Sequence, residues 1–458
     1  MTTSTPTPLP ERRGLWATAL RMAEQTPATR NRYVDLLRAL SIFAVIIGHW
    51  LVAATQVRDG VLVGENMLAV QPWTQWLTWV FQVMPVFFLV GGYSNGVSWA
   101  ATQRRGETYS NWLTSRIQRL INPVLPLFLA WVAFIAGARM IGMNAETIAL
   151  ASDLALIPVW FLAVYILVVA LVPVTRSAWE RFGMKSFWAL LGMAALVDIA
   201  NLGLGVPLVK YTNFIFVWAG MHQLGYAWEA GVLDGTAKRL ALAAGGLGLL
   251  TLLMVLGPYP LSFIGVPGDA FTNSMPPKLT IFALGIAQAG LVLALERFGR
   301  ALLERSTLWA AVILVNGMIM SLYLWHLTAS VLVTAGAWLA GVGLEADPGS
   351  QAWWVVRPFW LSLYAIATVP FIALFGRFER AGFEAPAQIS TWRLIGSVAL
   401  VCGGLTATAV SGIGSDDWAG FRIWVVALPF FGAALLDFGP LAHRRARTRM
   451  QTMLPRMV

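Results

Sequence analysis

The chain has few charges, one cysteine and little histidine. Only 12% of its 458 residues are Asp, Glu, Lys or Arg, about half the share of an average soluble domain, whereas 58% are hydrophobic. The single cysteine, Cys402, excludes an intramolecular disulfide and a cysteine-based metal cluster. The four histidines are scattered and no phosphate-binding glycine loop occurs, so we expect no metal and no tightly bound cofactor. So much apolar surface predicts a membrane protein.

Long apolar runs predict an all-α polytopic fold. A bilayer core requires roughly 20 apolar residues per helix. Segments of this kind cover residues 34–56, 75–100, 119–142, 157–175, 186–204, 208–230, 239–257, 278–295, 309–340, 353–376, 393–412 and 418–438, which gives about 12 transmembrane helices. The pair separated by a short Gly/Pro turn, 186–204 and 208–230, carries the weakest signal.

The distribution of basic residues predicts the orientation of these spans. With the N-terminus in the cytoplasm, all but six of the 32 Lys and Arg lie on the inner side. The six on the outer side are Arg58, Arg139, Lys210, Lys278, Arg357 and Arg422. The positive-inside rule therefore favours an even number of spans and two cytoplasmic termini. The net charge of +10 then reflects a cytoplasmic membrane face, and the basic run at 443–449 suits anionic lipid better than nucleic acid.

The first predicted span carries the densest set of ionisable side chains. Arg38 and His49 are eleven residues apart, which places them on one helix face with about 16 Å between them along the axis. Asp35 lies on the same face and can hold the Arg38 guanidinium. An Arg38 that snorkels to the lipid headgroups would explain this pair, but it would not explain a histidine deep in the bilayer. His49 is therefore a functional candidate.

The pattern of Asp35, Arg38, ten intervening residues and His49 resembles the opening helix of the acyltransferase-3 family of integral membrane acyltransferases. Four later segments match other motifs of that family in order: Met84–Tyr93, Ser115–Pro123, Pro158–Leu162 and Ser321–His326. Gly91 stands where the family usually has Ser or Thr, which puts a hydroxyl role at that position in doubt. The resemblance covers about residues 30–380.

The resemblance implies four parts. These are a cytoplasmic tail over 1–30, a ten-span acyltransferase domain over 31–380, two additional membrane helices within 381–440 and a basic cytoplasmic tail over 441–458. The tail over 1–30 is rich in Thr and Pro and has no apolar run, so we expect no cleaved signal peptide there. The protein is expected in the plasma membrane, most simply that of a bacterium.

The resemblance also implies an activity, the transfer of an acyl group, often acetyl, from acyl-CoA to a hydroxyl of a cell-envelope glycan, glycolipid or similar acceptor. His49 would be the general base or a transient acyl carrier. Cations on the inner side would bind the CoA phosphates, and Arg38, Arg116 and Arg119 are placed there, with Asp35 supporting Arg38.

Further residues of the matching segments are candidates for the lining of the reaction cavity: Phe87, Phe88, Tyr93, Ser94, Trp160, Tyr323 and His326. His326 has two interpretations, a core histidine bonded to a neighbouring helix or a cavity residue that binds the acceptor or shuttles a proton. The spacing of Gly92 and Gly96 favours close approach of two membrane helices. A transporter or flippase without covalent chemistry is the alternative function, since twelve spans with both ends inside is a common transporter plan.

Overall fold

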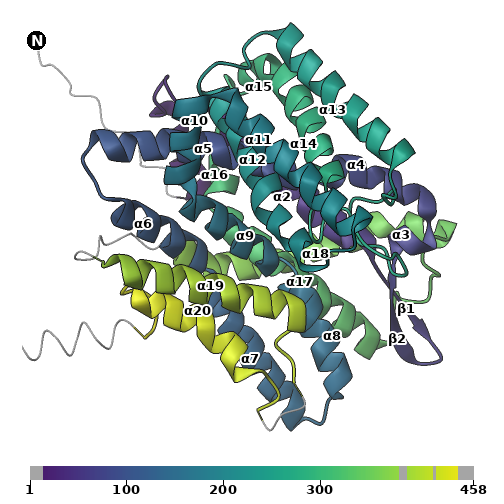
Figure 1. Cartoon of the computed structure of the whole chain (residues 1–458). Helices are drawn as coiled ribbons and strands as arrows, with labels where there is room; N and C mark the ends of the chain where they lie inside the picture. The colour runs from purple at the N-terminus through teal and green to yellow at the C-terminus, as the bar shows by residue number, and fades with distance from the viewer. Residues whose placement is uncertain (1–13, 381–388, 416–418, 442–458) are drawn as a thin grey trace, which may run out of the picture.

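The computed structural model describes residues 14–380, 389–415 and 419–441 (Figure 1). The described part is helical apart from loops and one two-stranded hairpin. Nine of its helices are long and apolar enough to cross a membrane, or ten if the bent pair formed by Leu279–Ala294 and Glu296–Leu302 is counted as one span. The predicted helical membrane architecture is therefore confirmed, whereas the count of twelve spans is not.

The elements in chain order are α1 (Leu15–Glu24), α2 (Arg32–Val52), β1 (Ala53–Arg58), β2 (Val61–Asn66), α3 (Met67–Val70), η1 (Pro72–Leu77), α4 (Thr78–Phe81), α5 (Met84–Arg104), α6 (Tyr109–Ile121), α7 (Val124–Met140), α8 (Ala145–Leu156), α9 (Val159–Ala170), α10 (Val172–Phe182), α11 (Met184–Asp198), η2 (Ile199–Gly203), η3 (Leu208–Thr212), α12 (Asn213–Glu229), α13 (Thr236–Leu256), α14 (Leu279–Ala294), α15 (Glu296–Leu302), α16 (Ser306–Asn316), α17 (Ile319–Ala340), α18 (Gln351–Glu379), α19 (Thr391–Ser411) and α20 (Ile423–Leu435).

Two of the later predicted spans form helices shorter than expected, and a third, which is long enough to break, is divided into two helices. The segments expected over 208–230 and 418–438 form α12 and α20, which have 17 and 13 residues. The long segment expected over 309–340 is interrupted after Asn316 and forms α16 and α17. The predicted basic run at 443–449 lies outside the described residues.

The first predicted span ends earlier than expected because the chain leaves α2 as a β-hairpin. Strands β1 and β2 pair antiparallel from Ala53 opposite Asn66 to Arg58 opposite Val61. Asp59 and Gly60 join them with φ values of 52° and 79°, the left-handed conformation that a two-residue hairpin turn requires. We call the end of the bundle that carries this pair the hairpin end.

Helices α5 and α12 pack with their backbones almost in contact, as the glycine spacing predicted. A Cβ added at Gly92 would lie 2.1 Å from the His222 carbonyl oxygen, and one at Gly225 would lie 2.3 Å from the Leu89 carbonyl oxygen. Only glycine permits this separation. Gly96 faces the Tyr226 ring, and a Cβ added at Gly96 would lie 3.0 Å from that ring.

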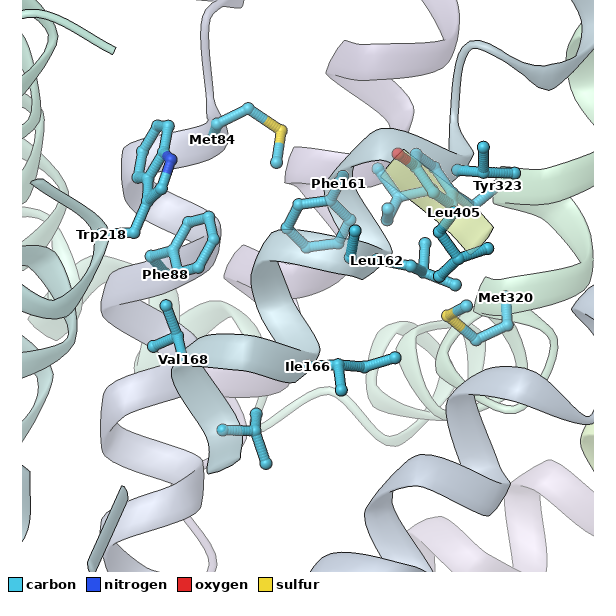
Figure 2. Packing of buried hydrophobic residues seen from close by; sticks show 14 of the residues in the cluster. Met84, Phe88, Phe161, Leu162, Ile166, Val168, Trp218, Met320, Tyr323 and Leu405 are labelled. Atoms are coloured by element: carbon cyan, nitrogen blue, oxygen red, sulfur yellow. The ribbon is translucent and has the colours of Figure 1, made fainter. Parts of the chain in front are cut away.

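Helix α9 runs through the centre of the apolar core (Figure 2). On one side its Phe161 ring meets Phe88 of α5, which stacks on Trp218 of α12 with 4.5 Å between centroids. On the other side Phe161 packs edge-on against Tyr323 of α17, 5.9 Å away. This aromatic row fixes α17 relative to α5 and α12.

A buried carboxylate ties the loop after α13 to the bundle. Asp198 accepts hydrogen bonds from the Tyr259 hydroxyl at 2.9 Å and from the backbone N–H of Leu279 at 2.8 Å. The second bond satisfies one of the free N–H groups at the start of α14. Burial, followed by the Asp198 charge, raises the pKa of the Tyr259 hydroxyl, so this residue remains a hydrogen-bond donor.

Candidate active site

Two histidines from helices far apart in the sequence meet inside the helical bundle. His49 Nδ1 of α2 and His326 Nε2 of α17 are 3.0 Å apart. The two ring planes differ by 4° with 5.2 Å between centroids, so the rings lie nearly in one plane and meet at their nitrogens. His326 is completely buried, whereas His49 is half-buried. The pair is therefore a hydrogen-bonded unit with His49 as its accessible member.

The backbone partner of His326 shows which ring nitrogens of the pair carry a hydrogen. His326 Nδ1 lies 2.7 Å from the Tyr323 carbonyl oxygen, which can only accept a hydrogen bond, so Nδ1 carries a hydrogen. In neutral His326 the Nε2 atom is then an acceptor, and His49 Nδ1 must donate to it. This leaves the lone pair of His49 on Nε2, which has no hydrogen-bond partner among the described residues. The arrangement prepares Nε2 of His49 to accept a proton.

A cavity of about 520 Å³ opens beside His49 at the hairpin end. Of the predicted site residues, Trp160 and Tyr323 share its lining with His49. The rest of the lining comes from α2, from the end of α4 and the start of α5, from α8, from the loop before α14 and from the end of α19. The Tyr323 hydroxyl donates to the Pro158 carbonyl oxygen at 2.8 Å, which joins two walls of the cavity.

Five other predicted lining residues do not line this cavity, and one of them is His326, which lies behind it in contact with His49. Phe87 and Phe88 pack in the core against Phe161. Ser94 hydrogen-bonds to Arg38 instead. Tyr93 packs on Trp228 with 4.7 Å between ring centroids and lines a second cavity among charged residues.

Arginines of α2 and α6 gather at the end of the bundle opposite the hairpin. Arg38 donates to Asp35 at 3.2 Å and to the Ser94 hydroxyl at 2.9 Å. Asp35 is buried and also accepts from Arg30 at 2.9 Å. The predicted support of Arg38 by Asp35 is therefore present in the structure. We call Arg38, Arg116 and Arg119 the arginine cluster.

The other two arginines of the cluster lie on α6. Arg116 donates to the Ser98 hydroxyl of α5 and lies 5.6 Å from the Trp112 ring, but its buried Nε has no partner among the described residues. Arg119 is exposed and acts electrostatically on Arg38, Arg116 and Glu379. Three like charges thus lie within electrostatic reach of one another, an arrangement suited to a multiply charged anion.

The comparisons with known proteins identify the family. The model of an acyltransferase domain matches residues 31–377, which is most of the chain. The protein belongs to the acyltransferase-3 family. No curated protein and no solved structure matches it. The acyltransferase-3 domain thus contains both the histidine pair and the arginine cluster, while α19 and α20 follow it.

The sequence analysis missed Tyr165 of the acyltransferase-3 domain. Its hydroxyl accepts from the Asn95 amide at 3.4 Å and interacts electrostatically with Arg38 and Arg116. A Cβ added at Gly91 would lie 3.0 Å from the Tyr165 ring and 3.2 Å from its hydroxyl. The glycine at the departure from the family pattern therefore makes room for Tyr165, a relation visible only once α5 and α9 are packed together.

Helix α18 contacts both helices of the histidine pair, the end of α2 after His49 and the start of α17 before His326. Near its start, buried Arg357 donates to the carbonyl oxygens of Trp50 and, at 2.8 Å, Ala53, where α2 ends just after His49. At its other end Glu379 accepts from the backbone N–H groups of Met320 and Ser321 at 3.0 and 2.9 Å. The positive Arg357 thus lies at the C-terminus of α2 and the negative Glu379 at the N-terminus of α17. Each charge is opposite in sign to the helix dipole end beside it, so both contacts are stabilising.

Proposed function

We propose that this protein transfers an acyl group, with acetyl as the first candidate, from acyl-CoA to a hydroxyl of a cell-envelope acceptor. The observation that carries the proposal is the hydrogen-bonded chain from the Tyr323 carbonyl through His326 to His49. It gives His49 a free basic nitrogen beside a cavity. A general base requires a histidine oriented in this way.

The transfer conserves atoms and charge as follows. His49 Nε2 takes the proton of the acceptor hydroxyl while the oxygen attacks the thioester carbonyl carbon. The carbon–sulfur bond then breaks, and the CoA thiolate receives the proton from His49. The products are an acyl ester and free CoA. His326 accepts the Nδ1 hydrogen bond throughout and stabilises the imidazolium formed midway, as an orienting partner does in other histidine-based sites.

The arginine cluster supports a donor site on the other side of the bundle. The CoA phosphates are multiply charged, and Arg38, Arg116 and Arg119 offer guanidinium groups near one another. Arg38 stands about 16 Å from His49 along α2, since the two residues are eleven positions apart. An extended thiol-bearing arm bound by its phosphates at the cluster would reach toward the histidine pair. In this proposal the arginine cluster and both chain termini face the cytoplasm.

The test uses the full-length protein purified into lipid nanodiscs and radiolabelled acetyl-CoA. The His49→Ala variant should lose thioester turnover and label transfer, while Phe43→Ala, a change of an exposed apolar residue on the same helix, should retain both. Turnover that survives in folded His49→Ala would refute the assigned role and favour the transporter.

A single-turnover reaction without acceptor separates the two chemical routes. Label bound covalently to the wild-type protein, and absent from the His49→Gln variant, would indicate a transient acyl-histidine. Label that stays in acetyl-CoA until an acceptor hydroxyl is added, with none bound to the protein, would indicate direct transfer with His49 as general base.

A further inference from the structure

One face of α5 connects the cavity beside His49 with the arginine cluster. At one end of this face Met84 lines the cavity. At the other end Ser94 and Ser98 accept hydrogen bonds from two arginines of the cluster. Successive residues of a helix are about 100° apart, which places these three residues and Gly91 within about 80° of one another around the axis. Gly91 lies about 10 Å from Met84 along the helix, near the middle of the face.

The Tyr165 ring of α9 covers the middle of this face. A Cβ added at Gly91 would lie 3.0 Å from the ring. One turn away along α5, Phe87 meets the same ring edge-on with 5.9 Å between centroids. Tyr165 is half-buried, whereas Phe161 and Ile166 of the same helix are buried in the core (Figure 2). Tyr165 therefore keeps accessible surface halfway between the cavity and the cluster.

A chain of buried polar side chains lies behind Tyr165 and runs in one direction. It ends at Thr175, whose hydroxyl donates to the Val172 carbonyl oxygen at 3.3 Å and therefore accepts from the Tyr226 hydroxyl at 3.1 Å. The Tyr226 oxygen in turn accepts from Nδ1 of His222 at 3.1 Å. In neutral His222 the Nε2 atom is then an acceptor.

The Asn95 amide connects this chain to Tyr165. The amide nitrogen is 3.1 Å from His222 Nε2 and 3.4 Å from the Tyr165 hydroxyl oxygen. It carries two hydrogens, so it donates to both atoms. The Tyr165 oxygen thus accepts one hydrogen bond, and no described residue accepts the hydrogen that this hydroxyl carries. The chain leaves Tyr165 as a hydrogen-bond donor without an acceptor.

The arginine cluster has the same excess of donors. Nε of Arg116 is buried and has no partner among the described residues. Ser98 accepts from Arg116 and also from the Trp112 indole, at 3.0 Å, which occupies both lone pairs of its hydroxyl. From the cluster to its middle, this face of α5 therefore presents donors that need oxygen acceptors from a ligand.

We infer that Tyr165 donates its hydroxyl hydrogen to an amide carbonyl oxygen in the arm of CoA, the chain between its phosphates and its thiol. This inference rests on the proposed function and adds a contact to its donor site. The arm contains two amide groups, and an amide oxygen is the acceptor that such a donor requires. An arm that is bound by its phosphates at the cluster and reaches His49 has to pass the middle of the α5 face.

The test measures the Kd of CoA and of ADP by isothermal titration calorimetry, with the full chain in lipid nanodiscs. ADP shares the adenosine and the diphosphate of CoA but has no arm. Tyr165→Phe should raise the Kd of CoA about three- to tenfold, since one hydrogen bond is lost, and leave the Kd of ADP unchanged. The control Tyr211→Phe, at an exposed tyrosine, should change neither value.

The polar chain is tested with Asn95→Leu. Alone, this change should weaken CoA by a factor similar to that of Tyr165→Phe, because the Tyr165 hydrogen is no longer directed outward. Added to Tyr165→Phe, it should weaken CoA no further. An equal loss of affinity in both backgrounds would mean that Asn95 acts by packing, and would refute the orientation inferred for Tyr165.

Two results with folded Tyr165→Phe would overturn the inference. The first is an unchanged Kd of CoA. The second is an equal loss for CoA and ADP, because the hydroxyl would then bind a phosphate. If CoA does not bind to the wild-type protein at all, the donor site of the proposed function fails instead, so the two failures are distinguishable.

Discussion

Replacement of His326 tests the orientation of His49 without touching the residue proposed to react. His326→Leu removes the acceptor of the His49 Nδ1 hydrogen bond, which is 3.0 Å long in the structure. His326→Gln keeps an amide oxygen that can accept from the same direction. If His326 acts by holding His49 in one tautomer, the glutamine variant should retain much more activity than the leucine variant. A role in packing alone would give the opposite order, because leucine is the better core residue.

The size of the effect follows from the charge that forms on His49. A hydrogen bond to a charged group contributes about 1.5–3 kcal/mol. Each 1.36 kcal/mol corresponds to about a tenfold change in rate, so His326→Leu should lower kcat by about 10- to 100-fold. Loss of tautomer control adds to this, and in other enzymes the wrong tautomer costs up to about 10⁴-fold. For His326→Gln we expect a loss of about tenfold or less.

The assay is turnover of radiolabelled acetyl-CoA by the purified full-length protein, with kcat and KM determined separately. Ser330→Ala on the same helix is the control, because among the described residues the Ser330 hydroxyl bonds only to the Leu327 carbonyl within α17. The KM for acetyl-CoA should change little in the His326 variants, since the arginine cluster is intact. A folded His326→Leu protein with wild-type kcat would refute the proposed orientation of His49.

Three further substitutions test the surroundings of the site. Arg38→Gln should raise the KM for acetyl-CoA about tenfold or more in steady-state assays, because a phosphate contact is lost; an unchanged KM would refute a donor site there. Arg357→Met leaves two helix-end carbonyls without their donor and should reduce stability by about 1–3 kcal/mol in chemical unfolding, with a lower kcat. Glu379→Gln keeps the shape but removes the charge at the start of α17, and should cost about 1 kcal/mol; melting temperatures equal to wild type would contradict both effects.

The helical period alone predicts that Arg38 and His49 lie on one helix face, because both residues belong to one helix and are eleven positions apart. The same rule explains why Tyr93 and Ser94 separate. Adjacent residues on a helix point about 100° apart, so Ser94 reaches Arg38 while Tyr93 turns to Trp228. Two neighbouring polar residues of one motif therefore belong to two different clusters, one around Arg38 and one around Trp228.

Contacts across the chain could not be read from local sequence. His49 and His326 are separated by 277 positions, and nothing in either segment specifies the 3.0 Å contact between their rings. The count of spans has a related cause. In α12 every residue from Val217 to Trp228 is buried, so this helix is solvated by protein and requires neither the length nor the apolarity that lipid imposes. A hydropathy profile identifies helices that face lipid, and α12 has little contact with lipid because the protein surrounds it.

Charges at helix ends contribute to the position of the histidine pair together with apolar packing. A hydrogen bond weakens steeply once its atoms move apart or its angle bends, so α2 and α17 must be fixed to a fraction of an ångström where the rings meet. Both helices are held by α18, through Arg357 at the end of α2 and Glu379 at the start of α17. Each contact pairs a formal charge with the opposite end of a helix dipole, and the burial of Arg357 strengthens its contact with the end of α2. A single helix that contacts both partners constrains the distance between them directly, in addition to the aromatic row that packs α17 against α9.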